Sequence, residues 1–317
     1  MSETLKVGLA QIAPVWLDRK KTTAKICDYV LQAADAACSL VAFGETLLPG
    51  YPFWLSSTHG SKFECDIQKD LHAHYLGAAV DLQRGDLQPI CEIAKSRGIA
   101  VMLGCYELGS DRGGHTGYCS LIFIEANGEV RNAHRKLVPT YEERLAWGSG
   151  DGNGLEVFPI GPFTLGGLNC WENWMPLPRT ALHGMGENLH VAVWPGAKRN
   201  TIDITRFIAI ESRSYVLSVS GLLRKSDVPD DFPHRDLVLD SFENEIISDG
   251  GSCIAAPNGD WIVEPVCDRE DLLIAELDYR EVLRERQNFD ISGHYSRPDV
   301  LKLSVNRDRQ NCLEDQP

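Results

Sequence analysis

Residues 164–174 read TLGGLNCWENW, and this stretch decides how the rest of the chain is interpreted. Residues 163–168 form a short strand-like run, and helix-forming residues follow from Pro176 to position 187. Cys170 is therefore expected at a strand-to-helix junction, where a sharp turn presents a sulfur at the sheet edge beside free backbone N–H groups. A lone buried cysteine is more often structural, so this placement makes Cys170 a candidate nucleophile that needs partners.

Strand and helix patterns alternate on both sides of this junction. We expect strands at 5–11, 40–43, 100–106, 117–124, 130–136, 163–168, 189–194, 215–222, 251–256, 261–266 and 272–277, and helices at 18–37, 86–97, 176–187, 203–213 and 279–286. An Asn127-Gly128 turn closes the first hairpin. The pattern predicts an α/β fold with sheets of mixed direction covered by helices. Residues 55–85 give no clear prediction, and 227–249 read as an acidic loop suited to a lid or partner surface.

Three residues that carry chemistry follow buried strands at comparable places: Glu45, Lys136 and Cys170. A free thiol has a pKa near ~8.5, so little thiolate exists at neutral pH without help. A carboxylate can accept the thiol proton, and an ammonium can stabilise charge that develops on nitrogen or oxygen. The residue types predict Glu45 as general base, Lys136 as electrostatic stabiliser and Cys170 as nucleophile. Each residue also has a non-catalytic interpretation. Glu45 could be a solvated surface carboxylate, Lys136 part of an exposed basic cluster around 131–136, and Cys170 a core thiol.

The segments around these residues resemble the three motif regions of the nitrilase superfamily. They read FGETLLPGYP around Glu45, HRKLVPTYEERLAWGSGDG around Lys136 and GGLNCWENWMPL around Cys170. The resemblance covers roughly residues 5–280. One departure is Gly44, where the family more often has proline, which leaves the backbone softer without removing the carboxylate.

The resemblance implies an αββα sandwich that dimerises through its helical faces into an αββα-αββα assembly. It implies a carbon–nitrogen hydrolase domain over 1–280, a tail over 281–317 that is mobile or contacts another subunit, and a homodimer or larger homo-oligomer. It also implies a fourth catalytic residue, Glu143, which orients Lys136 and the attacking water. Glu142 is adjacent, and the choice of Glu143 rests on register, because neighbouring side chains point in different directions.

Within the superfamily, Cys170-Trp171-Glu172 resembles the nitrilase branch, which implies hydrolysis of an organic nitrile to the carboxylic acid and ammonia through thioimidate and thioester intermediates. The alternatives are an amidase or N-carbamoyl hydrolase, a nitrile or cyanide hydratase that stops at the amide, and a catalytically silent partner-binding member. The Trp171 N–H is expected to complete the oxyanion site. Tyr51, Trp54 and Trp194 are candidates for the substrate pocket, although such aromatics are as commonly core residues.

The net charge of the chain limits the kinds of molecule that it is expected to bind. The formal charge of −14 disfavours nucleic acid and anionic membranes as partners and is compatible with a small nitrile substrate and water. The sequence has no signal-peptide pattern, no run of apolar residues that could span a bilayer, no HExxH spacing and no CxxC pair among its 10 cysteines. We therefore expect a cytoplasmic enzyme without metal or cofactor.

Overall fold

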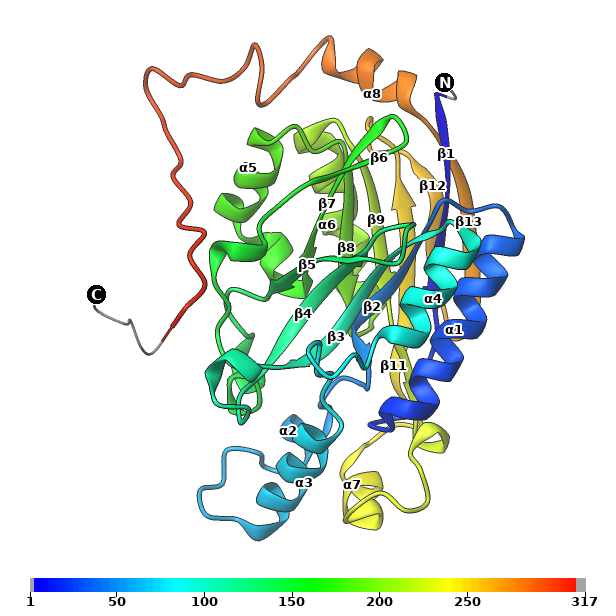
Figure 1. Ribbon diagram of the computed structural model, residues 1–317, viewed down its shortest axis with the longest axis vertical. Coiled ribbons are helices and arrows are strands. Elements are labelled where there is room, and N and C mark those ends of the chain that lie inside the picture. The colour runs from blue at the N-terminus through cyan, green and yellow to red at the C-terminus, as the bar shows by residue number, and fades with distance from the viewer. Residues whose placement is uncertain (1–2, 312–317) are drawn as a thin grey trace.

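Two mixed β-sheets lie face to face in the computed structural model, which describes residues 3–311 (Figure 1). The first sheet has the order β13-β1-β2-β3-β4-β5. Its strands are β1 (Thr4–Gln11), β2 (Leu40–Leu48), β3 (Ala100–Leu108), β4 (Gly117–Ile124), β5 (Val130–Arg135) and β13 (Asp271–Asp278). The strands β1, β2 and β3 run parallel, and the others pair with their neighbours in antiparallel fashion.

The second sheet has the order β10-β11-β9-β8-β7-β6, with β12 paired to β11. Its strands are β6 (Phe158–Ile160), β7 (Phe163–Asn169), β8 (Leu189–Trp194), β9 (Tyr215–Ser220), β10 (Leu222–Arg224), β11 (Ile246–Ala255) and β12 (Trp261–Cys267). The strands β7, β8 and β9 are parallel. Parallel neighbours need crossover connections, and helices supply them on the outer faces of the sheets.

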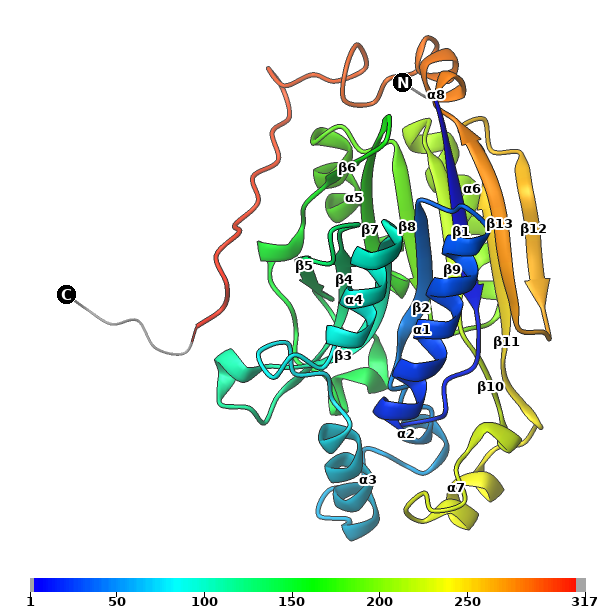
Figure 2. The same ribbon diagram turned by 45° about the vertical axis from the view of Figure 1, so that its right-hand side comes forward.

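The helices are α1 (Arg19–Asp35), α2 (Trp54–Ser57), α3 (Asp66–Gly77), α4 (Gln88–Arg97), α5 (Pro176–Gly184), α6 (Lys198–Ser212), α7 (Arg235–Ser241) and α8 (Tyr279–Arg286). α1 and α4 lie side by side on the first sheet, and α6 packs on the second (Figure 2). One apolar core fills the space between the sheets, and separate clusters join each sheet to its helices. The chain is therefore layered as helix, sheet, sheet and helix.

The expected elements are largely confirmed, with three corrections. β2 does not end at Phe43; it continues to Leu48 through an irregular pairing with β3, so Glu45 lies inside this distorted segment. α6 begins at Lys198 rather than Asp203. Residues 227–249 are not a single loop, because they contain α7 and the start of β11.

Glycine at position 44 allows the two sheets to approach closely beside Glu45. A Cβ built on Gly44 would lie 2.8 Å from the Gly221 nitrogen and 3.0 Å from the Trp194 carbonyl oxygen. Both contacts are backbone atoms, which have little freedom to move away. The absence of a side chain here is thus a packing requirement and not a source of softness.

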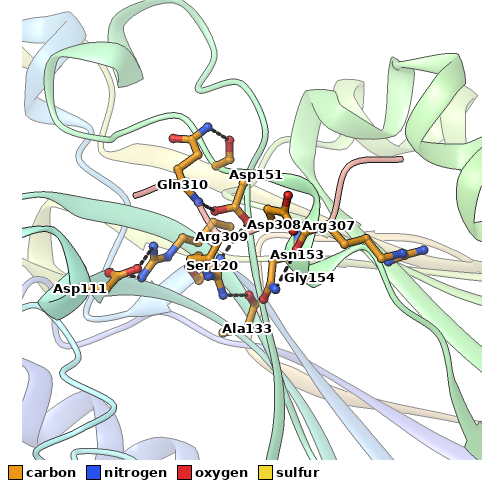
Figure 3. A network of polar contacts seen from close by, with 12 residues as sticks. Asp111, Ser120, Ala133, Asp151, Asn153, Gly154, Arg307, Asp308, Arg309 and Gln310 are labelled. Atoms are coloured by element: carbon orange, nitrogen blue, oxygen red, sulfur yellow. Dashed lines mark hydrogen bonds and ion pairs between the residues drawn. The ribbon is translucent and has the colours of Figure 1, made fainter. Parts of the chain in front are cut away.

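Beyond α8 the chain runs along the side of the molecule as an extended segment (Figure 1). Residues 307–310 of this segment are held against the turn at residues 150–154 by hydrogen bonds, two of which end on the Asp151 carboxylate (Figure 3). Arg309 Nη1 donates to Asp151 Oδ1 at 3.0 Å, and the Gln310 backbone N–H donates to Oδ2 at 3.0 Å. Asn153 donates to the Arg307 carbonyl oxygen at 3.0 Å.

Within residues 3–311, none of the helices combines the length and hydrophobicity that a bilayer crossing requires. The nine cysteines in this part of the chain are all free.

Candidate active site

A cleft of about 630 Å³ opens above Cys170. Its wall comes from the segments after β2 and β8, from the loop after β5 and from the 227–249 region. The lining residues are Tyr51, Phe53, Ser56, Ser57, Thr140, Glu142, Glu143, Cys170, Trp171, Pro195, Gly196, Ala197, Arg199, Asn200, Phe242, Ile247 and Ser248. The cleft gives the buried sulfur an opening through which a small molecule can reach it.

Cys170 stands where β7 passes into the short 3₁₀ helix η4 (Cys170–Trp174), as the sequence predicts. Its φ of 47° lies in the left-handed region, which is strained for a residue with a side chain and is typical of a nucleophile presented on a tight turn. Burial raises the pKa of the Cys170 thiol well above its ordinary value, Glu45 and Glu143 add to this, and Lys136 and the Trp171 N–H oppose it. The resting sulfur is therefore protonated and needs a base.

Glu45 supplies a carboxylate whose two oxygens differ. Oε1 accepts hydrogen bonds from Lys136 Nζ at 2.9 Å and from Cys119 Sγ at 3.3 Å. Oε2 is buried and has no hydrogen-bond partner. Burial, reinforced by Glu143 and opposed by Lys136, raises the pKa of Glu45 to about 7. A carboxylate with one free oxygen and a pKa near neutrality suits proton transfer.

Lys136 follows β5 directly and is completely buried between two carboxylates. Its Nζ donates to Glu45 Oε1 at 2.9 Å and to Glu143 Oε2 at 2.7 Å. Burial disfavours the ammonium, but Glu45, Cys170 and Glu143 outweigh it and hold the pKa of Lys136 well above its ordinary value. The amine therefore stays charged as an electrostatic stabiliser.

Glu143 is fixed by the 3₁₀ helix η2 (Tyr141–Leu145), which begins after Thr140. Glu143 Oε2 accepts from the Thr140 N–H at 2.6 Å, and Oε1 accepts from the Tyr51 hydroxyl at 2.7 Å. Glu142 lines the outer cleft and is partly exposed. The register that the sequence suggested therefore places Glu143, and not Glu142, against the lysine.

The thiol and the two carboxylates form a compact cluster. The Cys170 sulfur, one Glu45 oxygen and one Glu143 oxygen all lie within 4.8 Å of one another. Such a set could bind a metal ion, but the Lys136 ammonium already bridges both carboxylates. The positive charge in this cluster is thus that of the lysine.

The pocket aromatics divide into two groups. Tyr51 and Trp171 line the cleft, and half of Trp171 is exposed. Trp54 and Trp194 are almost fully buried and pack in apolar clusters, and neither is among the residues that line the cleft. The expectation that Trp54 and Trp194 face the substrate is therefore not met by their positions.

Two contributors to the site were not found from the sequence. Cys119 looked like an ordinary core thiol, yet it donates to Glu45 Oε1. The ring of Trp147 lies under the lysine, with Nζ 5.3 Å from its centroid. Cys119 lies on β4 and Glu45 on β2, and β3 separates these two strands in the sheet, so a strand prediction without sheet order could not reveal the contact.

Two facing mixed sheets that bring a thiol, two carboxylates and an amine into one cleft define this molecule as a layered α/β protein with a site suited to thiol-dependent hydrolysis. The chain is a member of the carbon–nitrogen hydrolase family, whose profile matches residues 6–286. It is 36% identical over 303 residues to "Nitrilase 2" of an unknown prokaryotic organism, covering 95% of this chain and 92% of that one. It is 34% identical over 309 residues to "Nitrilase 2" of Arabidopsis thaliana, covering 96% and 89% of the two chains.

The fold also matches solved structures of the same superfamily. A carbon–nitrogen hydrolase from Helicobacter pylori G27 superposes with a TM-score of 0.70 over 93% of this chain and 96% of that one, at 18% sequence identity. This likeness establishes the arrangement of the two sheets.

Proposed function

We propose that the protein hydrolyses an organic nitrile to its carboxylic acid and ammonia, with Cys170 as nucleophile. The observation that carries the proposal is the cluster in which the buried Cys170 sulfur, one Glu45 oxygen and one Glu143 oxygen all lie within 4.8 Å of one another, while Glu45 Oε2 has no hydrogen-bond partner. The nitrilase relatives and the Cys170-Trp171-Glu172 sequence favour a nitrile over other carbon–nitrogen substrates.

In the first step the Cys170 sulfur bonds to the nitrile carbon while its proton passes to Glu45. The negative charge that develops on the nitrile nitrogen is stabilised by the Lys136 ammonium and the Trp171 N–H. Glu45 then delivers the proton to this nitrogen, which gives a neutral thioimidate. Lys136 is assigned an electrostatic part because its raised pKa keeps its proton in place.

In the second step a water molecule, deprotonated by Glu45, adds to the thioimidate carbon. The nitrogen receives this proton to become an amine, then takes the proton of the new hydroxyl through Glu45 and leaves as ammonia, so a thioester remains on Cys170. A second water hydrolyses the thioester, releases the acid and returns a proton to the sulfur. Glu143 holds Lys136 throughout and helps to orient the water.

The same residues can act on an amide, because an amide enters the sequence directly at the tetrahedral stage. A hydratase outcome follows if the tetrahedral intermediate expels the sulfur before ammonia. The amidase and the hydratase are therefore the alternatives that the test must separate from the nitrilase.

The test is an assay of ammonia, acid and amide from phenylacetonitrile and fumaronitrile, beside the matching amides. We expect acid and ammonia in equal amounts from a nitrile, faster than from its amide, and no turnover by Cys170→Ala. Amide without ammonia would indicate a hydratase, and preference for the amides would indicate an amidase. A protein that turns over none of these and whose Cys170 resists iodoacetamide would be a silent member of the family.

We also propose that the chain forms a homodimer or a larger homo-oligomer through its helical face. Exposed apolar side chains gather on η4, α5 and α6, where Trp174, Leu177, Phe207 and Ile210 are each between 42% and 64% exposed. Trp174 and Phe207 stack at 6.5 Å between ring centroids. A Phe207→Glu variant should sediment as a monomer, whereas Leu283→Glu on α8 should leave the assembly intact.

The proposed partners are otherwise a small nitrile and water. Residues 1–280 are assigned to the hydrolase domain and 281–317 to a tail that is mobile or contacts another subunit, with residues 307–310 hydrogen-bonded to the hydrolase domain. The free cysteines support a reducing, cytoplasmic compartment.

A further inference from the structure

Glu172, the last residue of the Cys170-Trp171-Glu172 sequence, is buried and uses both carboxylate oxygens. Oε1 accepts a hydrogen bond from the Leu137 N–H at 2.9 Å. Oε2 accepts from the Asn169 N–H at 3.0 Å and lies 2.9 Å from His134 Nε2. The mechanism above gives this carboxylate no task.

These contacts connect the two sheets at the point where the site is assembled. His134 and Leu137 flank Lys136 at the end of β5 in the first sheet. Asn169 is the last residue of β7 in the second sheet and precedes Cys170. The Glu172 side chain therefore binds residues adjacent to Lys136 in one sheet and the residue before Cys170 in the other.

The other main-chain bonds of Lys136 do not perform this task. Its N–H donates to the Cys119 carbonyl oxygen at 2.7 Å, and its own carbonyl oxygen accepts from the Gly150 N–H at 2.8 Å. Cys119 belongs to β4 in the same sheet, and Gly150 belongs to the loop that follows. These bonds fix Lys136 relative to its own sheet, but they do not constrain its distance to Cys170 in the other sheet.

The contact set requires a carboxylate rather than an amide. Two backbone N–H groups and a histidine ring converge on two oxygens, and a glutamine NH₂ would face at least one of these donors. Burial opposes ionisation, but His134 and the two backbone donors hold the pKa of Glu172 below its ordinary value. The group is thus an ionised acceptor held by charge-assisted hydrogen bonds.

We propose that Glu172 is a positioning residue, which sets the separation between the Lys136 ammonium and the Cys170 sulfur by joining β5 to β7. It acts through the backbone and touches no reacting atom. The separation of the thiol and the amine matters for any substrate of this site. The expected effect of Glu172 on nitrile turnover rests on the proposed function.

The readout is the pH dependence of Cys170 alkylation by iodoacetamide, because Lys136 favours the thiolate. The other titratable groups around the sulfur are Glu45 on β2, Glu143 on η2, Cys119 on β4 and Tyr51. None of them contacts Glu172 directly in the hydrogen bonds of residues 3–311. A change at Glu172 therefore reaches the sulfur through the placement of Lys136.

The experiment compares Glu172→Gln with Glu187→Gln. Glu187 is an equally buried carboxylate that also pairs with a histidine, His190, at 2.8 Å. It is linked to the Cys170 carbonyl oxygen only indirectly, through His190 and Asn173, and among the hydrogen bonds of residues 3–311 it makes none to β5 or Leu137, so it does not join the two sheets beside Lys136. Both variants lose a buried ion pair, and both should lower the melting temperature. Modification is followed by mass spectrometry of the Cys170 peptide.

For Glu172→Gln we expect the midpoint of Cys170 alkylation to rise by at least about half a pH unit. We expect kcat on a nitrile to fall by about 10-fold to about 100-fold, with KM within about 3-fold of the wild-type value. Glu187→Gln should leave the alkylation midpoint and kcat unchanged. A Glu172→Gln protein that loses stability like the control, yet keeps the wild-type alkylation midpoint, overturns the proposal.

If Glu172→Gln does not fold, His134→Gln is tested in its place, because it removes one of the three hydrogen-bond partners of Glu172. It should shift the alkylation midpoint in the same direction by a smaller amount, and an unchanged midpoint in this variant also overturns the proposal. If the wild-type protein turns over no nitrile, the proposed function fails, while the alkylation measurement still decides the role of Glu172.

Discussion

Lys136 and Glu143, seven positions apart in the chain, are joined by a hydrogen bond of 2.7 Å between two buried side chains. The bond exists because η2 turns the chain back so that the Glu143 carboxylate meets the amine. The same carboxylate caps η2 and accepts the Tyr51 hydroxyl. Glu143 thus ties the lysine, the loop and the cleft wall together.

The neighbouring glutamates offer a direct comparison. Glu143→Gln should lower kcat/KM by about 10-fold to about 1000-fold, because it weakens a charge-assisted bond to Lys136 and removes a charge from the cluster. Glu142→Gln should retain wild-type kcat, since Glu142 is partly exposed and has no contact with the lysine among the hydrogen bonds of the described residues. Initial rates of ammonia release provide the measurement, and equal losses in the two variants would contradict the assignment.

The pH dependence follows from the raised pKa of Glu45. Only the ionised carboxylate can accept a proton, so kcat/KM should fall about 10-fold per pH unit below a midpoint near the Glu45 pKa of about 7. Because Glu143 raises this pKa, Glu143→Gln should move the midpoint to lower pH. A rate profile that stays flat from pH 5 to pH 8, with chemistry rate-limiting, would rule out Glu45 as the base.

The aromatic residues should separate specificity from stability. Trp171→Ala alters an exposed cleft wall, so we expect KM values for nitriles of different size to change by different factors with little loss of stability. Trp194→Phe leaves a void in the core and should lower stability by about 1 to 3 kcal/mol without changing substrate preference. Thermal unfolding and a panel of nitriles distinguish the two effects, and a change in preference with Trp194→Phe would contradict them.

The sequence could predict features that depend on residues close together in the chain, but not those that depend on how distant segments pack. Lys136 and Cys170 were found because each directly follows a strand, and Glu45 because it follows the regular part of β2, which pairs in register with β3 only as far as Phe43. Their burial and the free Oε2 of Glu45 required coordinates, since they depend on how closely two sheets approach. Glycine at position 44, which the sequence suggested would make the backbone softer, instead lies where the backbone of Gly221 and Trp194 leaves no room for a Cβ.

The links between segments were beyond reach of local patterns. Glu172 and His134 are 38 positions apart and meet only because β5 and β7 lie in facing sheets. Trp54 and Trp194 could not be assigned to core or cleft, because an aromatic residue near a strand end is compatible with both. The helix in residues 227–249 was missed because its seven residues give too short a pattern for a periodicity argument.

Acid stability should depend on Glu187. His190 and His183 outweigh burial and lower the pKa of Glu187 to about 2. The stabilisation is therefore complete above the ordinary carboxyl pKa of 4.5 and is lost as the pH falls toward 2. Denaturant unfolding of wild type should lose on the order of 3 kcal/mol across this window from this group alone. The loss in Glu187→Gln should be smaller by a similar amount, and parallel curves would contradict the prediction.

The extended C-terminal segment should contribute to stability through its contacts at the 150–154 turn. A chain that ends at Leu303 leaves the Asp151 carboxylate without Arg309 and Gln310, and removes Val305 from the cluster around Leu155. We expect a loss of about 1 to 3 kcal/mol, measured by denaturant unfolding. A chain that ends at Gln310 keeps these contacts and is the matched control, so equal stability of the two truncations would show that the contacts contribute nothing.

The division of the site between two facing sheets has a consequence for how this enzyme fails. Lys136 and Glu45 travel with one sheet and Cys170 with the other, so a relative slip of about 1 Å would disarm the chemistry while every strand and helix remained intact. We therefore expect inactivation to precede the loss of secondary structure when the two sheets shift against each other. The rate of turnover should therefore respond to a shift between the two sheets that circular dichroism of the secondary structure would not detect.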